Sequence, residues 1–401
     1  MSGLGHIIRG QITDRPIGPA GAVTMDLLRG LAALLVLGQH LRVLTFPAFA
    51  DSGAGGIAAR LFYFATSLGH SAVIVFFVLS GFLVGGRAVV AIQAERWTVR
   101  RYAVQRIGRI ATVLIPALAV GLVLDLFGLM SFGGLSIYGD GIAGHPMLDF
   151  ALRDHLTPAI LMGNILGLQP FLVTSFGSNS ALWSLGYEIW FYALFPILIL
   201  AIQGRMARSR ALAGLALVVA MLALMGPWGL AYFAIWALGA SLVAWPLSDR
   251  LRRRAGLVRS AVLAAAGLVV AALLVGKAAG YADLADMLLL PAAVALLVHA
   301  VAHLPRRPAV GPVRTRLAQG ARRLADISFS LYLVHVPLLT LVAAGLDRAG
   351  LLPLRFDPRG LGLYAVLFVL TLLYAAAFAG LTERRTDDIR AWLSRRRVAA
   401  S

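Results

Sequence analysis

Ten apolar stretches divide the chain, and polar segments, most of them rich in arginine, separate these stretches. A helix needs ~17–25 apolar residues to cross the hydrocarbon core of a bilayer. The pattern therefore predicts an all-α, polytopic membrane helix bundle of about ten transmembrane helices. We place them at about 22–42, 68–86, 110–130, 186–203, 211–226, 228–246, 260–277, 285–303, 327–346 and 361–381. The predicted domains are a cytoplasmic N-terminal tail at 1–21, a transmembrane domain at 22–382 and a basic cytoplasmic C-terminal tail at 383–401.

Composition supports a membrane protein and excludes several chemistries. The chain is 60% hydrophobic and 13% charged, whereas soluble domains average ~45–50% apolar and ~25% charged residues. It contains no cysteine, so a disulfide framework, a thiolate nucleophile and a cysteine-bound metal are excluded. We interpret the formal charge of +18 as arginines in loops that set the topology. We expect no nucleic-acid partner and no metal site.

The placement of basic residues predicts the orientation. Loops assigned to the cytoplasm carry 28 of the 36 arginines and lysines, and the opposite loops carry seven. An excess of this kind on alternate loops is typical of the cytoplasmic side, so both termini are expected there. A weaker apolar patch at 157–172 is predicted to be re-entrant or interfacial, because a span there would put the later arginine clusters outside.

The first apolar stretch also imitates a signal peptide, with arginines before it and "PAFAD" after it. The long leader ahead of the apolar run, and a histidine at its end, favour a retained first helix.

Two ionisable residues frame that first stretch, "RGLAALLVLGQH". Arg29 and His40 are eleven residues apart, which is ~16 Å along a helix at 1.5 Å per residue and about 20° from three whole turns. They therefore share one helix face at two depths. Histidine is the natural proton acceptor near neutral pH. The plain alternative is a snorkelling Arg29 and a His40 at the outer headgroups.

Polar residues also interrupt later spans. Ser184, Glu188 and Tyr192 have i, i+4, i+8 spacing and share a face, and "DISFSLYLVHVP" places Tyr332 and His335 in the ninth span. Interhelical hydrogen bonds would explain the serines. Ionisable groups at membrane depth cost ~2.5–3.5 kcal/mol each, so one polar cavity that includes His40, Glu188 and His335 explains three such exceptions together.

Arg106 and Arg109 are i, i+3 neighbours where the third span enters the membrane. Two guanidinium groups there could clamp phosphates. The alternative is a topology anchor attracted to anionic lipids.

These segments, taken together and in order, resemble acyltransferase family 3, a family of bacterial integral-membrane acyltransferases. The resemblance rests on "LRGLAALLVLGQH", "FFVLSGFLVGG", "RRYAVQRIGRI", "WSLGYEIWFYALFP" and "ISFSLYLVHVP", with a final "TERR" like the family's closing Glu. It covers roughly 25–385.

The resemblance implies an enzyme of the bacterial inner membrane that transfers an acyl group from cytoplasmic acyl-CoA to a hydroxyl. The acceptor would be a surface carbohydrate, a glycolipid or a glycoside. Acetyl-CoA would be the default co-substrate, and no cofactor would be permanently bound. The fused esterase-like domain of some members is not expected here.

The resemblance also implies roles for individual residues. His40 matches the family's essential histidine, Arg29 its partner arginine and Glu188 its acidic position. Arg106 and Arg109 match the motif associated with the acyl donor. Tyr332 and His335 match the late Tyr/His motif and are assigned to the donor site.

Two functional hypotheses follow. In the first, His40 is the general base of an O-acyltransferase, and Glu188 or Asp326 orients an imidazole. In the second, the chain is a secondary transporter of a small anionic or sugar-like solute. Transporters commonly contain inverted repeats and helices broken at matching positions, and neither is evident in this sequence.

Overall fold

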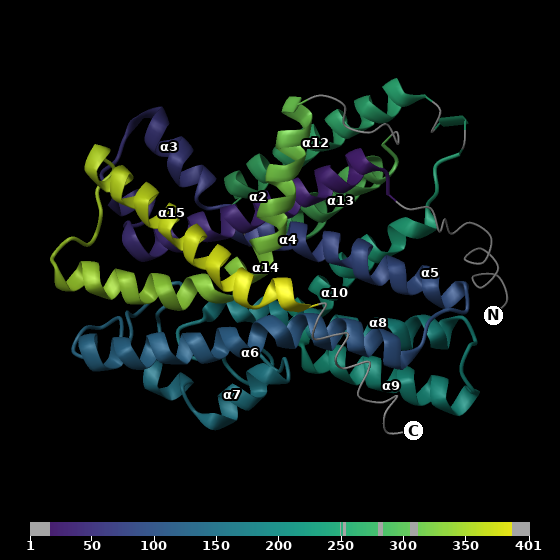
Figure 1. Ribbon diagram of the computed structural model, residues 1–401, viewed down its shortest axis with the longest axis horizontal. Coiled ribbons are helices and arrows are strands. Elements are labelled where there is room, and N and C mark those ends of the chain that lie inside the picture. The colour runs from purple at the N-terminus through teal and green to yellow at the C-terminus, as the bar shows by residue number, and fades with distance from the viewer. Residues whose placement is uncertain (1–16, 249, 252–253, 280–283, 305–311, 387–401) are drawn as a thin grey trace. The chain divides into compact units, whose positions relative to one another are not determined.

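A computed structural model describes residues 17–248, 250–251, 254–279, 284–304 and 312–386. Most of each predicted terminal tail lies outside these residues. The described part of the chain is helical and contains no strand (Figure 1). The helices are α2 (Pro19–Thr45), α3 (Gly56–Ala65), α4 (Gly69–Ser80), α5 (Arg87–Gln93), α6 (Val99–Phe132), α7 (Pro158–Ile165), α8 (Trp183–Ile202), α9 (Arg208–Leu224), α10 (Gly226–Ser241), α12 (Ala255–Ala279), α13 (Leu284–Ala302), α14 (Pro312–Arg348) and α15 (Pro358–Leu381).

All ten predicted apolar stretches fall on helices, and this confirms the all-α membrane class. In the described residues, eight helical segments are long and apolar enough to cross a membrane. The other two predicted spans fall on α9, which has 17 residues, and on α13, whose apolar part is Met287–Ala302. The count of ten and the cytoplasmic placement of the termini stay predictions.

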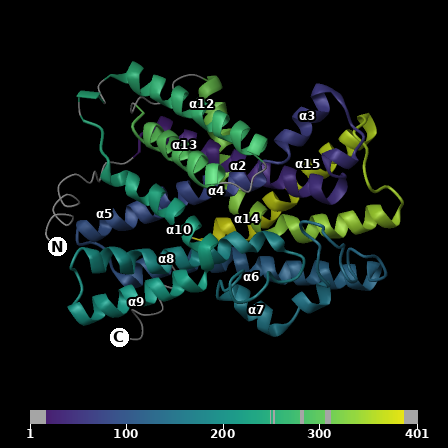
Figure 2. The same ribbon diagram turned by 180° about the vertical axis from the view of Figure 1, so that it is seen from behind.

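The segment between α6 and α8 folds back on itself. Its helix α7 has eight residues, about 12 Å at 1.5 Å per residue, which is too short for a span. Thr157 caps the helix by accepting a hydrogen bond from the Ile160 amide. The buried Asn164 donates to the carbonyls of Ile160 and Thr174 and accepts from the amide of Phe176. In both views α7 lies beside α6 (Figures 1 and 2). The 157–172 patch is therefore not a span, and its re-entrant or interfacial placement stays a prediction.

The chain forms two compact units, and we describe each by itself. The first consists of residues up to 32, 71–99 and 187–325, and the second of 33–70, 100–186 and 326 onward. We call them the first unit and the second unit. Five helices, α2, α4, α6, α8 and α14, contain a boundary between the units, which in α6 falls after its first residue.

Glycine allows two helical segments of the first unit to pack closely. The segment Gly81–Gly86 is a π-helix that continues α4, and it packs against α10. A Cβ on Gly81 would overlap the carbonyl oxygen of Trp236, and a Cβ on Gly239 would overlap that of Val78. Small residues at such crossings are typical of membrane helices. In the same unit α12 and α13 lie side by side (Figure 2).

In the second unit, an asparagine side chain replaces a backbone hydrogen bond that a proline removes from α14. Pro337 interrupts α14, and because proline has no amide hydrogen, the carbonyl of Leu333 loses its helical partner. The side chain of Asn179 donates to this carbonyl at 2.7 Å. On another side of the same unit, α3 lies against the start of α15 through Phe62 and Tyr364 (Figure 1).

We expect Gly81→Ala to destabilise the protein by about 1–3 kcal/mol, because the methyl group forces two helical segments apart. The matched control is Gly267→Ala on α12, where an added Cβ meets no atom within 4 Å and alanine is the better helix former. Thermal unfolding in detergent, followed by tryptophan fluorescence, measures both. A Gly81→Ala midpoint equal to that of the control would contradict this packing.

Candidate functional site

His40 and His335 form a direct pair in the second unit. Nδ1 of His40 lies 2.7 Å from Nε2 of His335. The ring planes differ by 4° and the ring centroids are 5.0 Å apart, which is close to the nitrogen–nitrogen distance plus two ring radii. The rings are therefore coplanar and joined edge to edge by a hydrogen bond. His335 is 1% exposed, and its Nδ1 lies 2.8 Å from the carbonyl oxygen of Leu331 on its own helix.

Tyr332, next to this pair on α14, is hydrogen-bonded to the start of α8. Its hydroxyl lies 2.6 Å from the hydroxyl of the buried Ser184, and its ring centroid lies 6.1 Å from that of His335. Ser184 was predicted to share a face with Glu188 and Tyr192, but its hydrogen-bond partner comes from α14.

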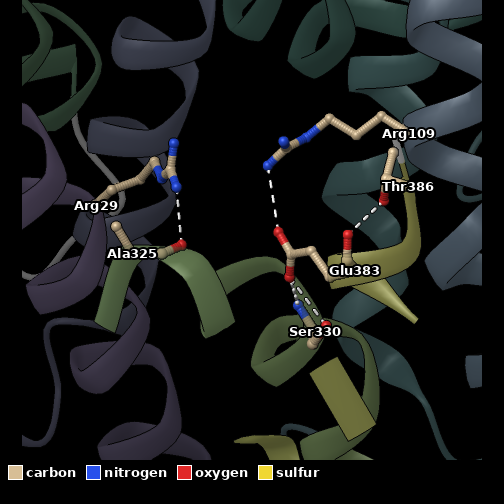
Figure 3. A network of polar contacts seen from close by, with 6 residues as sticks. All are labelled: Arg29, Arg109, Ala325, Ser330, Glu383 and Thr386. Carbon is tan, nitrogen blue, oxygen red and sulfur yellow. Dashed lines mark hydrogen bonds and ion pairs between the residues drawn. The ribbon is translucent and has the colours of Figure 1, made fainter. Parts of the chain in front are cut away.

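Glu383, in the 3₁₀ turn Glu383–Arg385 that follows α15, contacts residues of α6 and α14 in the second unit (Figure 3). One carboxylate oxygen lies 3.4 Å from Nη2 of Arg109. The other accepts from the hydroxyl of Ser330 at 3.0 Å and from its amide at 3.3 Å. The Arg109 guanidinium also lies over the ring of Phe329, at 5.8 Å from the centroid. Because the side chain of Arg109 is 40% exposed, the ion pair itself adds little stability; it holds the guanidinium in place.

Arg106 lies one turn earlier on α6. Its guanidinium carbon is 6.0 Å from the ring centroid of Tyr102, a cation–π contact within the same helix. The structure thus places both arginines of the predicted phosphate clamp in the second unit, with an aromatic ring beside each.

Arg29 belongs to the first unit. It lies on α2, as predicted, and its Nη2 donates to the carbonyl oxygen of Ala325 at 2.8 Å (Figure 3). Gly30 allows this approach, because a Cβ there would overlap the side chain of Leu324.

Glu188 is the end of a directional hydrogen-bond chain in the first unit. The hydroxyl of Tyr192 donates to the carboxylate at 2.7 Å, which confirms their predicted shared face. The hydroxyl of Ser80 then donates to the Tyr192 oxygen at 3.1 Å. The indole N–H of Trp236 donates to Ser80, also at 3.1 Å.

Sequence reasoning missed three features of these clusters. His40 has an imidazole as its hydrogen-bond partner, whereas we had expected Glu188 or Asp326 to orient an imidazole, and Asp326 is exposed. Glu383 was noted only as a closing acid, yet a carboxylate at the end of the last span was a usable signal for an arginine partner. Trp236 carried no signal. Among the described residues, no group of three His, Asp or Glu side chains could hold a metal ion.

Comparisons with known proteins agree with the resemblance seen in the sequence. The family model for the acyltransferase domain of acyltransferase family 3 matches residues 23–380. The chain is 26% identical over 330 residues to acyltransferase MdmB of Streptomyces mycarofaciens, which covers 77% of this chain and 76% of that protein. No solved structure matches the chain.

These matches decide between the two hypotheses, because the family is one of enzymes and the transporter alternative has no support among them. The chain belongs to acyltransferase family 3 and is a multi-pass membrane enzyme that transfers acyl groups.

Proposed function

We propose that this enzyme moves an acetyl group from cytoplasmic acetyl-CoA to a hydroxyl of a carbohydrate, glycolipid or glycoside, with His40 as the general base. The observation that carries the proposal is the hydrogen-bonded pair of His40 and His335 on two membrane helices. A histidine that accepts a proton, with its other ring nitrogen bonded to an orienting group, is the arrangement that general-base catalysis requires.

The reaction needs two proton transfers, one to His40 and one from it. The acceptor hydroxyl gives its proton to His40 while its oxygen attacks the thioester carbonyl carbon. The carbon–sulfur bond then breaks, and His40 returns the proton to the departing thiolate, which leaves as CoA. Direct transfer of this kind needs no acyl-enzyme. Because the chain has no cysteine, a covalent intermediate would have to use serine or histidine.

Arg106 and Arg109 are proposed to bind the phosphates of CoA. Guanidinium groups bind phosphate oxygens in a bidentate manner, and Glu383 and Phe329 hold that of Arg109 in position. Ser330, in this cluster, lies five residues before His335 on α14, about 7.5 Å along the axis. The pantetheine arm of CoA, which joins the phosphates to the thioester, is long enough to cover this separation.

The remaining predicted site residues take their roles from the resemblance. Arg29 and Glu188 are proposed as catalytic residues. Tyr332 and His335 were assigned to donor binding, and their contacts with Ser184 and His40 support a place for both beside the reacting groups. We further propose that the enzyme works in the bacterial inner membrane, with both termini in the cytoplasm.

Replacing His40 by alanine is expected to lower acyl transfer by about 10²–10⁴-fold, the usual contribution of a general base. Purified protein is incubated with radiolabelled acetyl-CoA and membrane lipid extract, and acceptor-dependent release of CoA is measured. The control, Thr340→Val, removes a buried hydroxyl of α14 that donates to a carbonyl of its own helix, that of Val336. A folded His40→Ala variant with full activity would exclude His40 as the base.

Replacing Arg109 by lysine is expected to raise KM for acetyl-CoA by about 10-fold and to change kcat less, because an ammonium group cannot form the bidentate contact. Arg100→Lys is the matched control, at an exposed arginine near the start of the same helix. If both variants raise KM equally, the effect comes from losing any guanidinium group on this helix and not from a phosphate site at Arg109.

The acceptor is identified by comparing glycan and lipid masses of a deletion strain with those of the strain complemented by the wild-type chain or by His40→Ala. We expect one species to lose the mass of an acetyl group in the deletion strain and to regain it only with the wild type. If the lost mass is that of a heavier acyl group, the mechanism stands but the donor is another acyl-CoA and not acetyl-CoA.

A further inference from the structure

We infer that His335 fixes the tautomer of His40 and shares its proton during transfer, and that His335 is thus a positioning residue and not a donor-binding one. The inference rests on the proposed function, since it matters only if His40 is the base. It follows from two hydrogen bonds that form one line, from the carbonyl oxygen of Leu331 through His335 to His40.

The line begins at the carbonyl oxygen of Leu331. A carbonyl can only accept a hydrogen bond, so the Nδ1 of His335, 2.8 Å away, must carry the hydrogen. In a neutral imidazole the second nitrogen then has a lone pair and can only accept. Nε2 of His335 is therefore an acceptor that is directed at His40.

The contact between the rings then determines the state of His40. Nδ1 of His40 lies 2.7 Å from Nε2 of His335, and because the latter accepts, the former must donate. His40 is consequently the Nδ1–H tautomer, and its Nε2 has the free lone pair that a general base needs. Without this contact, a neutral histidine in water favours the opposite tautomer, in which Nε2 carries the hydrogen.

The same contact helps after the proton has moved. When His40 takes the acceptor's proton at Nε2, both of its nitrogens carry hydrogens and the ring is positively charged. The hydrogen on Nδ1 still points along the short bond to His335, and because the rings are coplanar, the bond lies close to the lone-pair direction. The positive charge is thereby shared between two rings. The proton finally leaves Nε2 for the thiolate, and both histidines return to their starting state.

The surroundings keep His335 in this geometry. Its side chain is 1% exposed, and Asn179 holds the carbonyl of Leu333 at 2.7 Å, within the same turn of α14. This part of α14 is thus fixed both at the ring of His335 and at its backbone. The role corresponds to that of the third member of a catalytic triad, with a neutral ring in place of a carboxylate.

The direct test measures the tautomer. Protein labelled with ¹⁵N-histidine is studied in detergent micelles, and His40→Ala identifies the His40 signals by their loss. We expect the wild type to show a protonated Nδ1 and an unprotonated Nε2 on His40, and His335→Met to show the reverse. An unchanged tautomer in His335→Met would overturn the inference.

Kinetics provide the second test. His335→Met replaces the accepting imidazole by an apolar side chain of similar length. We expect kcat to fall about 100-fold with KM for acetyl-CoA unchanged. His335→Gln places an amide oxygen near the position of Nε2 and is expected to restore at least one tenth of wild-type kcat. A raised KM with unchanged kcat would return His335 to the donor site and overturn the inference.

A double variant separates this inference from the proposed function. If His335 acts through His40, His40→Ala with His335→Met is no slower than His40→Ala alone. If the activity losses of the two single variants multiply in the double variant, the positioning role is contradicted. If the wild-type protein transfers no acyl group from any CoA thioester, the proposed function fails, while the tautomer measurement still decides the contact between the two rings.

Discussion

A polar group inside an apolar helix bundle must find its partner within the protein, and the structure follows from this constraint. A buried donor or acceptor without a partner costs ~1–3 kcal/mol, and lipid offers no replacement for water. His335, Glu383 and Glu188 each meet the constraint with a contact to another residue. These contacts join α14 to α2, the turn after α15 to α6, and two residues of α8 to each other. These three ionisable residues thus belong to pairs or short chains of polar side chains.

The backbone follows the same rule. Pro337 removes one hydrogen bond from α14, and Asn179 replaces it. The π-helix at Gly81–Gly86 lies where glycine lets α10 approach the backbone, and a π-bulge of this type often occurs near functional sites. In both cases the irregular part of a helix is covered by protein.

The helices could be predicted well from the sequence, but the hydrogen-bond partners of the polar side chains could not, for a physical reason. Hydrophobic length determines which segments can be membrane helices, so all ten apolar stretches are helical, although only eight segments in the described residues have the length of a span. Spacing within one helix determines which residues share a face, so Glu188 and Tyr192 do meet. Spacing says nothing about which other helix lies opposite that face. For this reason the sequence could predict an interhelical bond for Ser184 and a shared polar cavity for His40 and His335. It could not predict that Tyr332 is the partner of Ser184, or that the two histidines bond directly to each other.

The hydrogen bond from Asn179 has a consequence for how this chain can vary. Asn179 lies at the end of the long segment after α6, just before the 3₁₀ turn Ser180–Leu182 that leads into α8. Its hydrogen bond attaches that segment to the turn of α14 that carries His335. Insertions or exchanges earlier in the segment can alter its surface while the histidine keeps its place. A change at Asn179 itself would release the carbonyl of Leu333. Related enzymes can therefore diverge more freely at the exposed positions of this segment than at this asparagine.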